Sequence, residues 1–136
     1  MILLGIIDLT DTIKEIINLT DLFLLDIKHI NPNKCKDLVG FSNEKELEFA
    51  KYLSKNHKPI WIRQVIIPGI TDNEDDLKNL KNFISSLKTV EKVELLKYHD
   101  MGKFKWQNLG YCYELEGILP ATEEDIIRAK KILDIN

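Results

Sequence analysis

The sequence is poor in cysteine, and this limits the sites that it can form. Its two cysteines, Cys35 and Cys112, lie far apart, with no Cys-x-x-Cys motif and no local histidine partner that would complete a zinc pattern. The same spacing excludes the disulfide framework of a small secreted protein. We therefore expect two free thiols and a protein of the reducing cytoplasm.

Long apolar runs and an excess of positive charge are also missing. The N-terminal run Ile2–Ile7 is too short to span a membrane or to form the core of a signal peptide, so we expect no membrane contact. With 19 basic and 22 acidic residues the formal net charge is -3, which argues against binding nucleic acid through its phosphate backbone. No glycine-rich loop follows an apolar segment, so a phosphate-binding barrel fragment is a weak interpretation.

What is present suits one globular domain. The 136 residues are 44% hydrophobic and 30% charged, which is ordinary for a chain with a buried core. No repeat, low-complexity tract or internal linker divides the sequence. We assign residues 1–136 to a single domain.

Three apolar segments predict strands. In Asp21–Lys28 four large apolar residues follow one another, which predicts a parallel strand buried on both faces. Ile60–Ile67 is rich in β-branched and aromatic residues and stops at Pro68-Gly69, and Val90–Lys97, with Val93, Leu95 and Leu96, predicts a third strand. Because amphipathic helical patterns alternate with these segments, the sequence predicts an α/β fold with a parallel sheet.

Four helices are expected, each opened by a polar residue three positions before an acidic one. The first covers Asp11–Leu19, with Thr12 and Glu15 as its cap, and the second covers Glu44–Ser54, with Asn43 and Glu46 as its cap. Thr71 and Glu74 cap the third, and Thr122 begins the last. The segments Asn31–Lys34, Gly40–Ser42 and Tyr98–Ala121 are interpreted as loops.

Two opposite charges close the first predicted strand. Asp26 and Lys28 are two residues apart, so they project from the same face at the carboxyl end of the sheet, where α/β proteins bind ligands. A sheet of three strands with helices on one face leaves its other apolar face in need of cover, which is typical of a piece of a larger barrel. The unpaired first strand would also offer an edge for self-association.

A set of motifs in fixed order carries a resemblance. Asp-x-Lys ends at Lys28, Leu38-Val39-Gly40 and Ser42-Asn43 precede a helix, Trp61-Ile62-Arg63 leads to Pro68-Gly69, and Tyr-His-x-x-Gly-Lys-x-Lys-Trp covers 98–106. From about Leu19 to the C-terminus, this order and spacing resemble the pyruvate formate-lyase activating enzymes of the radical S-adenosylmethionine superfamily.

The resemblance implies a fold and a chemistry. The fold is the C-terminal half of a partial parallel (β/α) barrel of the radical S-adenosylmethionine type, with about three strands and flanking helices. Members of the family cleave S-adenosylmethionine at a four-iron, four-sulfur cluster, and the resulting radical takes a hydrogen from a glycine of a partner such as pyruvate formate-lyase. The protein positions the cofactor against its substrate.

The resemblance also implies roles for individual residues. The positions that match S-adenosylmethionine contacts are Lys28, Arg63, Val65, Leu96 and His99. Asp26, with the Leu24 carbonyl, resembles part of a monovalent-cation site. The positions near the partner enzyme are Arg63, Gly102, Lys103, Lys105 and Trp106.

Several family features are missing from the sequence. The motif Cys-x-x-x-Cys-x-x-Cys that holds the cluster is absent, as is the glycine-rich S-adenosylmethionine strand. Where the family has Asp-Thr-x-Gly, Ile2-Leu3-Leu4-Gly5 stands, so the acidic residue that would complete the cation site is also missing. We expect no iron-sulfur ligand, no catalytic residue and no radical catalysis by this chain alone.

The expected explanation is that the chain is the C-terminal half of an activase, produced by a truncated gene, a displaced start codon or a deliberately shortened chain. The alternative is a non-catalytic module that binds the glycyl-radical enzyme or complements a separate N-terminal half.

Simpler roles remain open for the same side chains. Asp26 and Lys28 can form a purely structural ion pair with each other, and Arg63 can have Asp26 as its acidic partner. His99 can be an ordinary loop histidine, and we interpret His29 and His57 as surface residues. Trp61 is expected in the core rather than in a cofactor platform.

Overall fold

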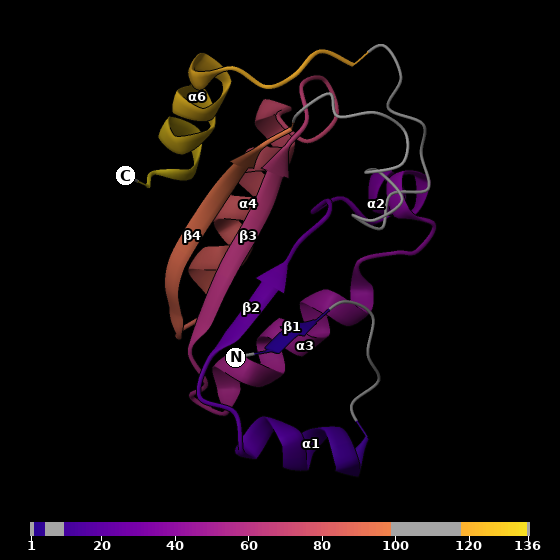
Figure 1. Ribbon diagram of the computed structural model, residues 1–136, viewed down its shortest axis with the longest axis vertical. Helices are drawn as coiled ribbons and strands as arrows, with labels where there is room; N and C mark the ends of the chain where they lie inside the picture. Colours follow the sequence, from indigo (N-terminus) through magenta and orange to yellow (C-terminus); the bar gives the residue numbers. More distant parts are fainter. Residues whose placement is uncertain (1, 5–9, 99–117, 136) are drawn as a thin grey trace.

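The computed structural model describes residues 2–4, 10–98 and 118–135 (Figure 1). In chain order the described elements are β1 Ile2–Leu4, α1 Asp11–Asn18, β2 Phe23–Asp26, α2 Pro32–Val39, α3 Glu44–Lys55, β3 Ile60–Ile66, α4 Glu74–Ser86, β4 Val90–Lys97 and α6 Glu123–Leu133. No helix in these ranges is long and apolar enough to cross a membrane.

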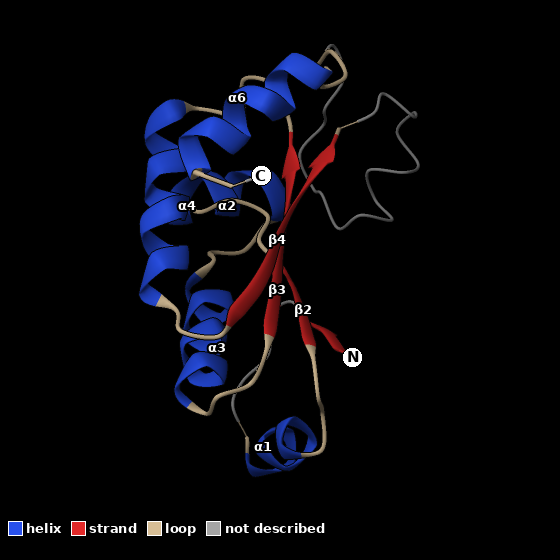
Figure 2. Ribbon diagram, turned by 90° about the vertical axis from the view of Figure 1, so that its left-hand side faces the viewer, coloured by secondary structure: helices blue, strands red, loops and turns tan. Residues whose placement is uncertain are grey.

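The strands form one parallel sheet in the order β1-β2-β3-β4. Helices α3, α4 and α6 lie together on one side of this sheet (Figure 2). The predicted α/β fold with a parallel sheet is confirmed, and β4 has the predicted bounds.

The fourth strand was not predicted. Residues Ile2–Leu4 pair with Phe23, Leu24 and Leu25 of β2, so the edge that the sequence left unpaired has a neighbour. The short apolar run at the N-terminus is long enough for a strand of this length, although it is too short for a membrane span.

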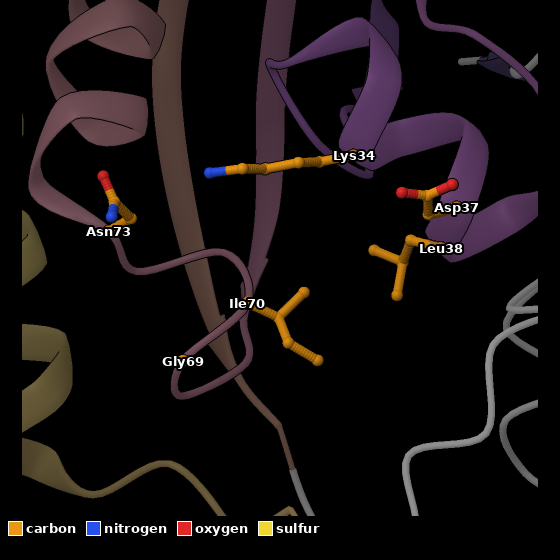
Figure 3. A pocket seen from close by; sticks show the side chains of 6 residues that line it. All are labelled: Lys34, Asp37, Leu38, Gly69, Ile70 and Asn73. Carbon is orange, nitrogen blue, oxygen red and sulfur yellow. The ribbon is translucent and has the colours of Figure 1, made fainter.

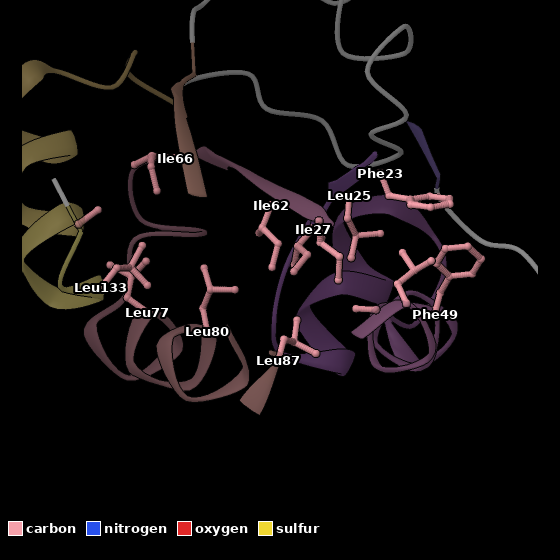
Figure 4. Packing of buried hydrophobic residues seen from close by; sticks show 14 of the residues in the cluster. Phe23, Leu25, Ile27, Phe49, Ile62, Ile66, Leu77, Leu80, Leu87 and Leu133 are labelled. Atoms are coloured by element: carbon pink, nitrogen blue, oxygen red, sulfur yellow. The ribbon is translucent and has the colours of Figure 1, made fainter. Parts of the chain in front are cut away.

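The core lies between the sheet and the helical layer. Phe23 and Leu25 of β2 are buried, whereas Leu24 and Asp26 are half-buried, so the prediction of a strand buried on both faces is wrong. Figure 4 shows side chains of β2 and β3 packed against Phe49 of α3 and Leu80 of α4.

A helix replaces one of the predicted loops. Residues Pro32–Val39 form α2, whose first turn is capped by the Asn31 side chain, which accepts from the N–H groups of Asn33 and Lys34. The helix ends at Gly40, which has a φ of 88° that glycine adopts without a steric cost. A proline at the first position of a helix and a glycine just after its last turn are known helix signals, so the sequence did indicate this helix.

Two helix caps differ from their prediction. Thr10 rather than Thr12 caps α1, and Asn73 rather than Thr71 caps α4. The Thr71 hydroxyl instead donates to the Val65 carbonyl and accepts from the Ile67 N–H, which fixes the turn after β3.

The other two helices begin near their predicted residues. Asn43 precedes α3, but its side chain makes no cap hydrogen bond and instead donates to the carbonyls of His29 and Ile30. Thr122 and Asp125 form a capping box at the start of α6.

The ends of the undescribed segment 99–117 connect to the sheet at one place. The Tyr98 N–H donates to the Ile66 carbonyl at 3.1 Å, and the Ala121 N–H donates to the Tyr98 carbonyl at 2.9 Å. The chain therefore returns to the residue from which it left the sheet.

Replacing Leu80 by alanine tests the importance of the helical layer. Leu80 is 1% exposed, so we expect Leu80→Ala to lower the free energy of unfolding by about 2–5 kcal/mol through lost burial and a cavity. Leu19→Ala is the control, because Leu19 is 86% exposed and its truncation should change little. Urea denaturation measures both, and equal losses in the two variants would contradict this description of the core.

Candidate functional site

One face of the sheet points away from α3, α4 and α6 (Figure 2), and five of the predicted site residues lie on it. Asp26 is in register with Arg63, and Val65 with Leu96. Paired residues of parallel strands project from the same face, and so do residues two apart in a strand. Leu24, Asp26, Arg63, Val65 and Leu96 therefore share this face, which we call the open face.

The last residue of β2, Asp26, has a hydrogen-bond partner for only one of its two carboxylate oxygens. The Lys28 ammonium donates to Asp26 Oδ2 at 2.8 Å, and the two side chains are 16% and 22% exposed. The sequence left open that Asp26 and Lys28 form an ion pair with each other, and this ion pair is observed. Asp26 Oδ1 is buried and has no hydrogen-bond partner in the described part of the chain, so this oxygen is available to a ligand.

Arg63 lies in the middle of the open face. Its Nε is 3.8 Å from Glu94 Oε2, so its acidic partner is Glu94 rather than Asp26. An ion pair of this length on a half-exposed surface contributes at most about 1 kcal/mol. Arg63 Nε is buried without a hydrogen-bond partner among the described residues, which leaves it suited to an anionic ligand.

Trp61 is on the open face and not in the core that the sequence analysis expected. It pairs in register with Leu24 and is half-buried. The Lys92 ammonium lies 5.1 Å from the centre of its ring, a cation–π distance.

Glu46 is a feature of this region that the sequence analysis assigned only to a helix cap. It is 5% exposed in the first turn of α3, and its Oε2 has no hydrogen-bond partner within the described ranges. Burial, followed by the negative charge of Asp26, raises the pKa of Glu46 to about 7, and the charge of Lys28 opposes the shift. Burial is a tertiary property, so no local signal in the sequence identified it.

Cys35 is buried on α2, and it is a free thiol as predicted. Burial, followed by the negative charge of Glu46, raises the pKa of the Cys35 thiol to about 11, so the thiol is protonated at neutral pH. Cys112 lies outside the described residues.

His29 is buried, so its interpretation as a surface residue is wrong. It is 1% exposed, its Nε2 donates to the Ile70 carbonyl at 2.8 Å, and its Nδ1 accepts from the Asn31 N–H at 3.1 Å. These two bonds fix the neutral tautomer and tie the loop after β2 to the turn after β3. His57 is exposed, as predicted.

Asp76, in the first turn of α4, connects that helix to α2 and to His29. Its Oδ2 accepts from the Lys34 ammonium at 2.6 Å and lies 3.8 Å from His29 Nε2. Burial lowers the pKa of His29, and the Ile70 carbonyl and the charge of Asp76 only partly oppose this.

A cleft of about 220 Å³ lies beside this network, between α2 and the turn after β3 (Figure 3). Its lining residues are Lys34, Asp37, Leu38, Gly69, Ile70 and Asn73. None of them was predicted as a site residue. The cleft shares no lining residue with the open face, although its Leu38 and Ile70 belong to the same hydrophobic cluster as Val65.

The remaining predicted site residues cannot be placed. His99, Gly102, Lys103, Lys105 and Trp106 lie outside the described residues.

We expect the buried His29 to make stability depend on pH. Its pKa is lowered on folding, so below about pH 6.5, the ordinary histidine value, the unfolded chain takes up a proton that the folded chain resists, and stability falls with acidification. In His29→Gln this contribution is absent, and the loss between pH 7.5 and 5.5 should be smaller, by at most about 1.4 kcal/mol per pH unit. Urea denaturation across this range measures the difference. The matched variant His57→Gln should keep the pH dependence of the unmodified chain, and an equal change in both variants would contradict the assignment.

The comparisons with known proteins agree on one family. No family model matches the sequence. The chain is 47% identical over 120 residues to the pyruvate formate-lyase-activating enzyme of Streptococcus mutans, covering 88% of this chain and 46% of that protein. It is 43% identical over 122 residues to the pyruvate formate-lyase 1-activating enzyme of Escherichia coli, covering 90% of this chain and 50% of the relative.

A solved structure supports the fold. A domain of pyruvate-formate lyase-activating enzyme from Bacteroides vulgatus superposes with a TM-score of 0.74 at 23% identity, over 91% of this chain and 68% of that one. The chain spans about half the length of the curated relatives that it matches. Over that half, the chain is a homologue of the pyruvate formate-lyase-activating enzymes, and its fold is the partial parallel barrel that the sequence predicted.

Proposed function

We propose that the chain is the C-terminal part of an enzyme that generates a glycyl radical on pyruvate formate-lyase or a related enzyme, with S-adenosylmethionine and a four-iron, four-sulfur cluster as cofactors. The observation that carries this proposal is the open face. Four positions to which the resemblance assigns cofactor contacts meet there or directly beside it: Lys28, Arg63, Val65 and Leu96.

The residues of the open face fit S-adenosylmethionine. Lys28 and Arg63 are cations that suit its carboxylate, and the orphaned Arg63 Nε provides a donor for it. Val65 and Leu96 offer an apolar surface to its adenine ring. When bound at a reduced cluster, S-adenosylmethionine supplies the deoxyadenosyl radical. The residues of this chain bind and orient the molecule, and His99 is proposed to join them.

The residues of this chain do not fit the iron-sulfur cluster. A cluster is held by cysteine thiolates, and the whole sequence has two cysteines, of which Cys35 is buried with a pKa of about 11. In the described ranges no three His, Cys, Asp or Glu side chains gather into a metal site. We therefore propose no radical step and expect the chain to be inactive alone.

A cation and a partner enzyme complete the proposed site. Asp26, through its orphaned Oδ1, and the Leu24 carbonyl would hold a monovalent cation. Arg63 and the residues Gly102, Lys103, Lys105 and Trp106 would face the glycyl-radical enzyme. We place the protein in the cytoplasm, where a free thiol such as Cys35 stays reduced.

Anaerobic reconstitution with iron and sulfide tests the absence of a cluster site. We expect neither the charge-transfer absorption of a four-iron cluster nor cleavage of S-adenosylmethionine, because the thiolate ligands are missing. The Escherichia coli relative, treated in parallel, is the positive control. The proposal that the chain is inactive alone would be contradicted if this chain gave both the four-iron absorption and cleavage of S-adenosylmethionine.

A second candidate function is a non-catalytic module that binds the glycyl-radical enzyme or complements a separate N-terminal half. One observation favours complementation: in the described part of the chain, α3, α4 and α6 all lie on one side of the sheet. The reading frame upstream distinguishes the two candidates, since a cysteine triplet in frame restores the enzyme and an intact neighbouring gene that carries it indicates a split protein.

Mixing experiments test the open face directly. With the N-terminal half of the Streptococcus mutans relative added as a separate polypeptide, we expect a complex that binds S-adenosylmethionine. Arg63→Ala should weaken this binding about 10- to 100-fold, the effect of losing one charge-assisted hydrogen bond. Isothermal titration calorimetry measures the affinity, with Lys78→Ala on the exposed face of α4 as the control. Equal affinities of the two variants would contradict a cofactor role for Arg63.

A further inference from the structure

Strand β3 continues past the end of β2 at the carboxyl edge of the sheet (Figure 1). The last pair in register between β2 and β3 is Asp26 with Arg63, and the Ile27 N–H still donates to the Arg63 carbonyl at 2.9 Å. On its other side β3 stays paired with β4 to its last residue. The backbone that follows, at Lys28 and at Val65, therefore lies beyond the pairing of β2 with β3.

A buried glutamine joins these two strand ends. Gln64 is 2% exposed, and its Nε2 donates to the Lys28 carbonyl at 3.3 Å and to the Val65 carbonyl at 3.0 Å. A carboxamide nitrogen has two N–H donors, so both are used. Because alternate residues of a strand direct their carbonyls to the same neighbour, the Val65 carbonyl faces the side on which β2 lies, as that of Arg63 does. The Gln64 side chain thus takes the place of a strand-pairing bond.

A second buried side chain holds the same carbonyl. The Thr71 hydroxyl donates to the Val65 carbonyl at 2.7 Å and accepts from the Ile67 N–H at 2.7 Å. The Val65 carbonyl therefore accepts two hydrogen bonds, the number that its two lone pairs allow. Its position is fixed both from the end of β2 and from the turn after β3.

The two peptide groups that Gln64 joins belong to residues of the proposed cofactor site. The Val65 side chain is on the open face, and the Lys28 ammonium is bound to Asp26 at the end of β2. Gln64 lies between Arg63 and Val65 in β3, so its own side chain projects from the opposite face, which the helices cover (Figure 2). It does not face a ligand on the open face and acts on the site through the backbone.

We propose that Gln64 is a positioning residue for S-adenosylmethionine. By joining the Lys28 and Val65 peptide groups, it sets the spacing between the ammonium that suits the carboxylate of the cofactor and the apolar surface that suits its adenine ring. One molecule has to meet both groups at once, so this spacing determines how well it binds. The proposal rests on the proposed function for the contacts of Lys28 and Val65.

Amide hydrogen exchange of the full chain tests the bridge without any cofactor. Gln64→Met keeps an unbranched side chain of similar length and removes both donors. We expect the Ile27 N–H, which donates to the Arg63 carbonyl, to exchange about 10-fold faster, because the two strand ends separate more often. The Phe23 N–H, bound to the Pro59 carbonyl at the other end of β2, should change less. Equal acceleration at both amides, the result of a general loss of stability, overturns the proposal, and so does no acceleration at either.

Binding of S-adenosylmethionine tests what the bridge does for the site. In the complex with the N-terminal half of the Streptococcus mutans relative, Gln64→Met should bind S-adenosylmethionine about 10-fold more weakly, a usual effect of removing a group that orients the contacts of a ligand. Isothermal titration calorimetry measures the affinity.

Ser54→Ala is the matched control for this measurement. Ser54 is 5% exposed, and its hydroxyl accepts from the Lys88 N–H at 2.7 Å, so this variant also loses a buried bond from a side chain to the backbone, but one just before β4 begins. Its complex should bind S-adenosylmethionine as the unmodified complex does. Equal affinities of Gln64→Met and Ser54→Ala overturn the proposal.

Failure of the positioning role and failure of the proposed function give different results. If the complex of the unmodified chain does not bind S-adenosylmethionine, the proposed function is overturned, and the cofactor role of Gln64 with it. If that complex binds S-adenosylmethionine and the Gln64→Met complex binds it equally well, the role of Gln64 alone is overturned.

Discussion

The parallel register of β2, β3 and β4 is the constraint on which the rest of the structure depends. Asp26 is in register with Arg63, and Arg63 is in register with Glu94, so polar side chains of three strands lie on one face. Their neighbours Leu25 and Ile62 point to the other face, which the helices bury. A slip of one residue would exchange the two faces and expose the core, so the packing of apolar residues also positions the polar site.

Much of this arrangement could be predicted from the sequence because it depends on local patterns. The apolar segments that became β2, β3 and β4 and the capping box at Thr122 are visible in short stretches of sequence. The placement of Lys28, Arg63, Val65 and Leu96 followed from the alternation of strand side chains and from the order of the motifs. The helix α2 was missed although Asn31, Pro32 and Gly40 indicated it.

Other features depend on contacts between distant parts of the chain, and local patterns do not contain them. The burial of His29 depends on the turn after β3, whose Ile70 carbonyl accepts a hydrogen bond from the His29 ring. Glu46 was assigned to a helix cap because its position three residues after Asn43 fits one, and its burial depends on how α3 packs against the sheet. The pairing of Ile2–Leu4 with β2 joins segments that are separated by a helix.

The backbone hydrogen bond between Ala121 and Tyr98 has a consequence for the last helix. Tyr98 directly follows β4, and its own N–H is bound to the Ile66 carbonyl at the end of β3, so the residue that leads into α6 is held at the carboxyl edge of the sheet. The α6 helix then contacts α4 and β4 from a fixed starting point. Its place in the helical layer is therefore set by the edge of the sheet as well as by side-chain packing.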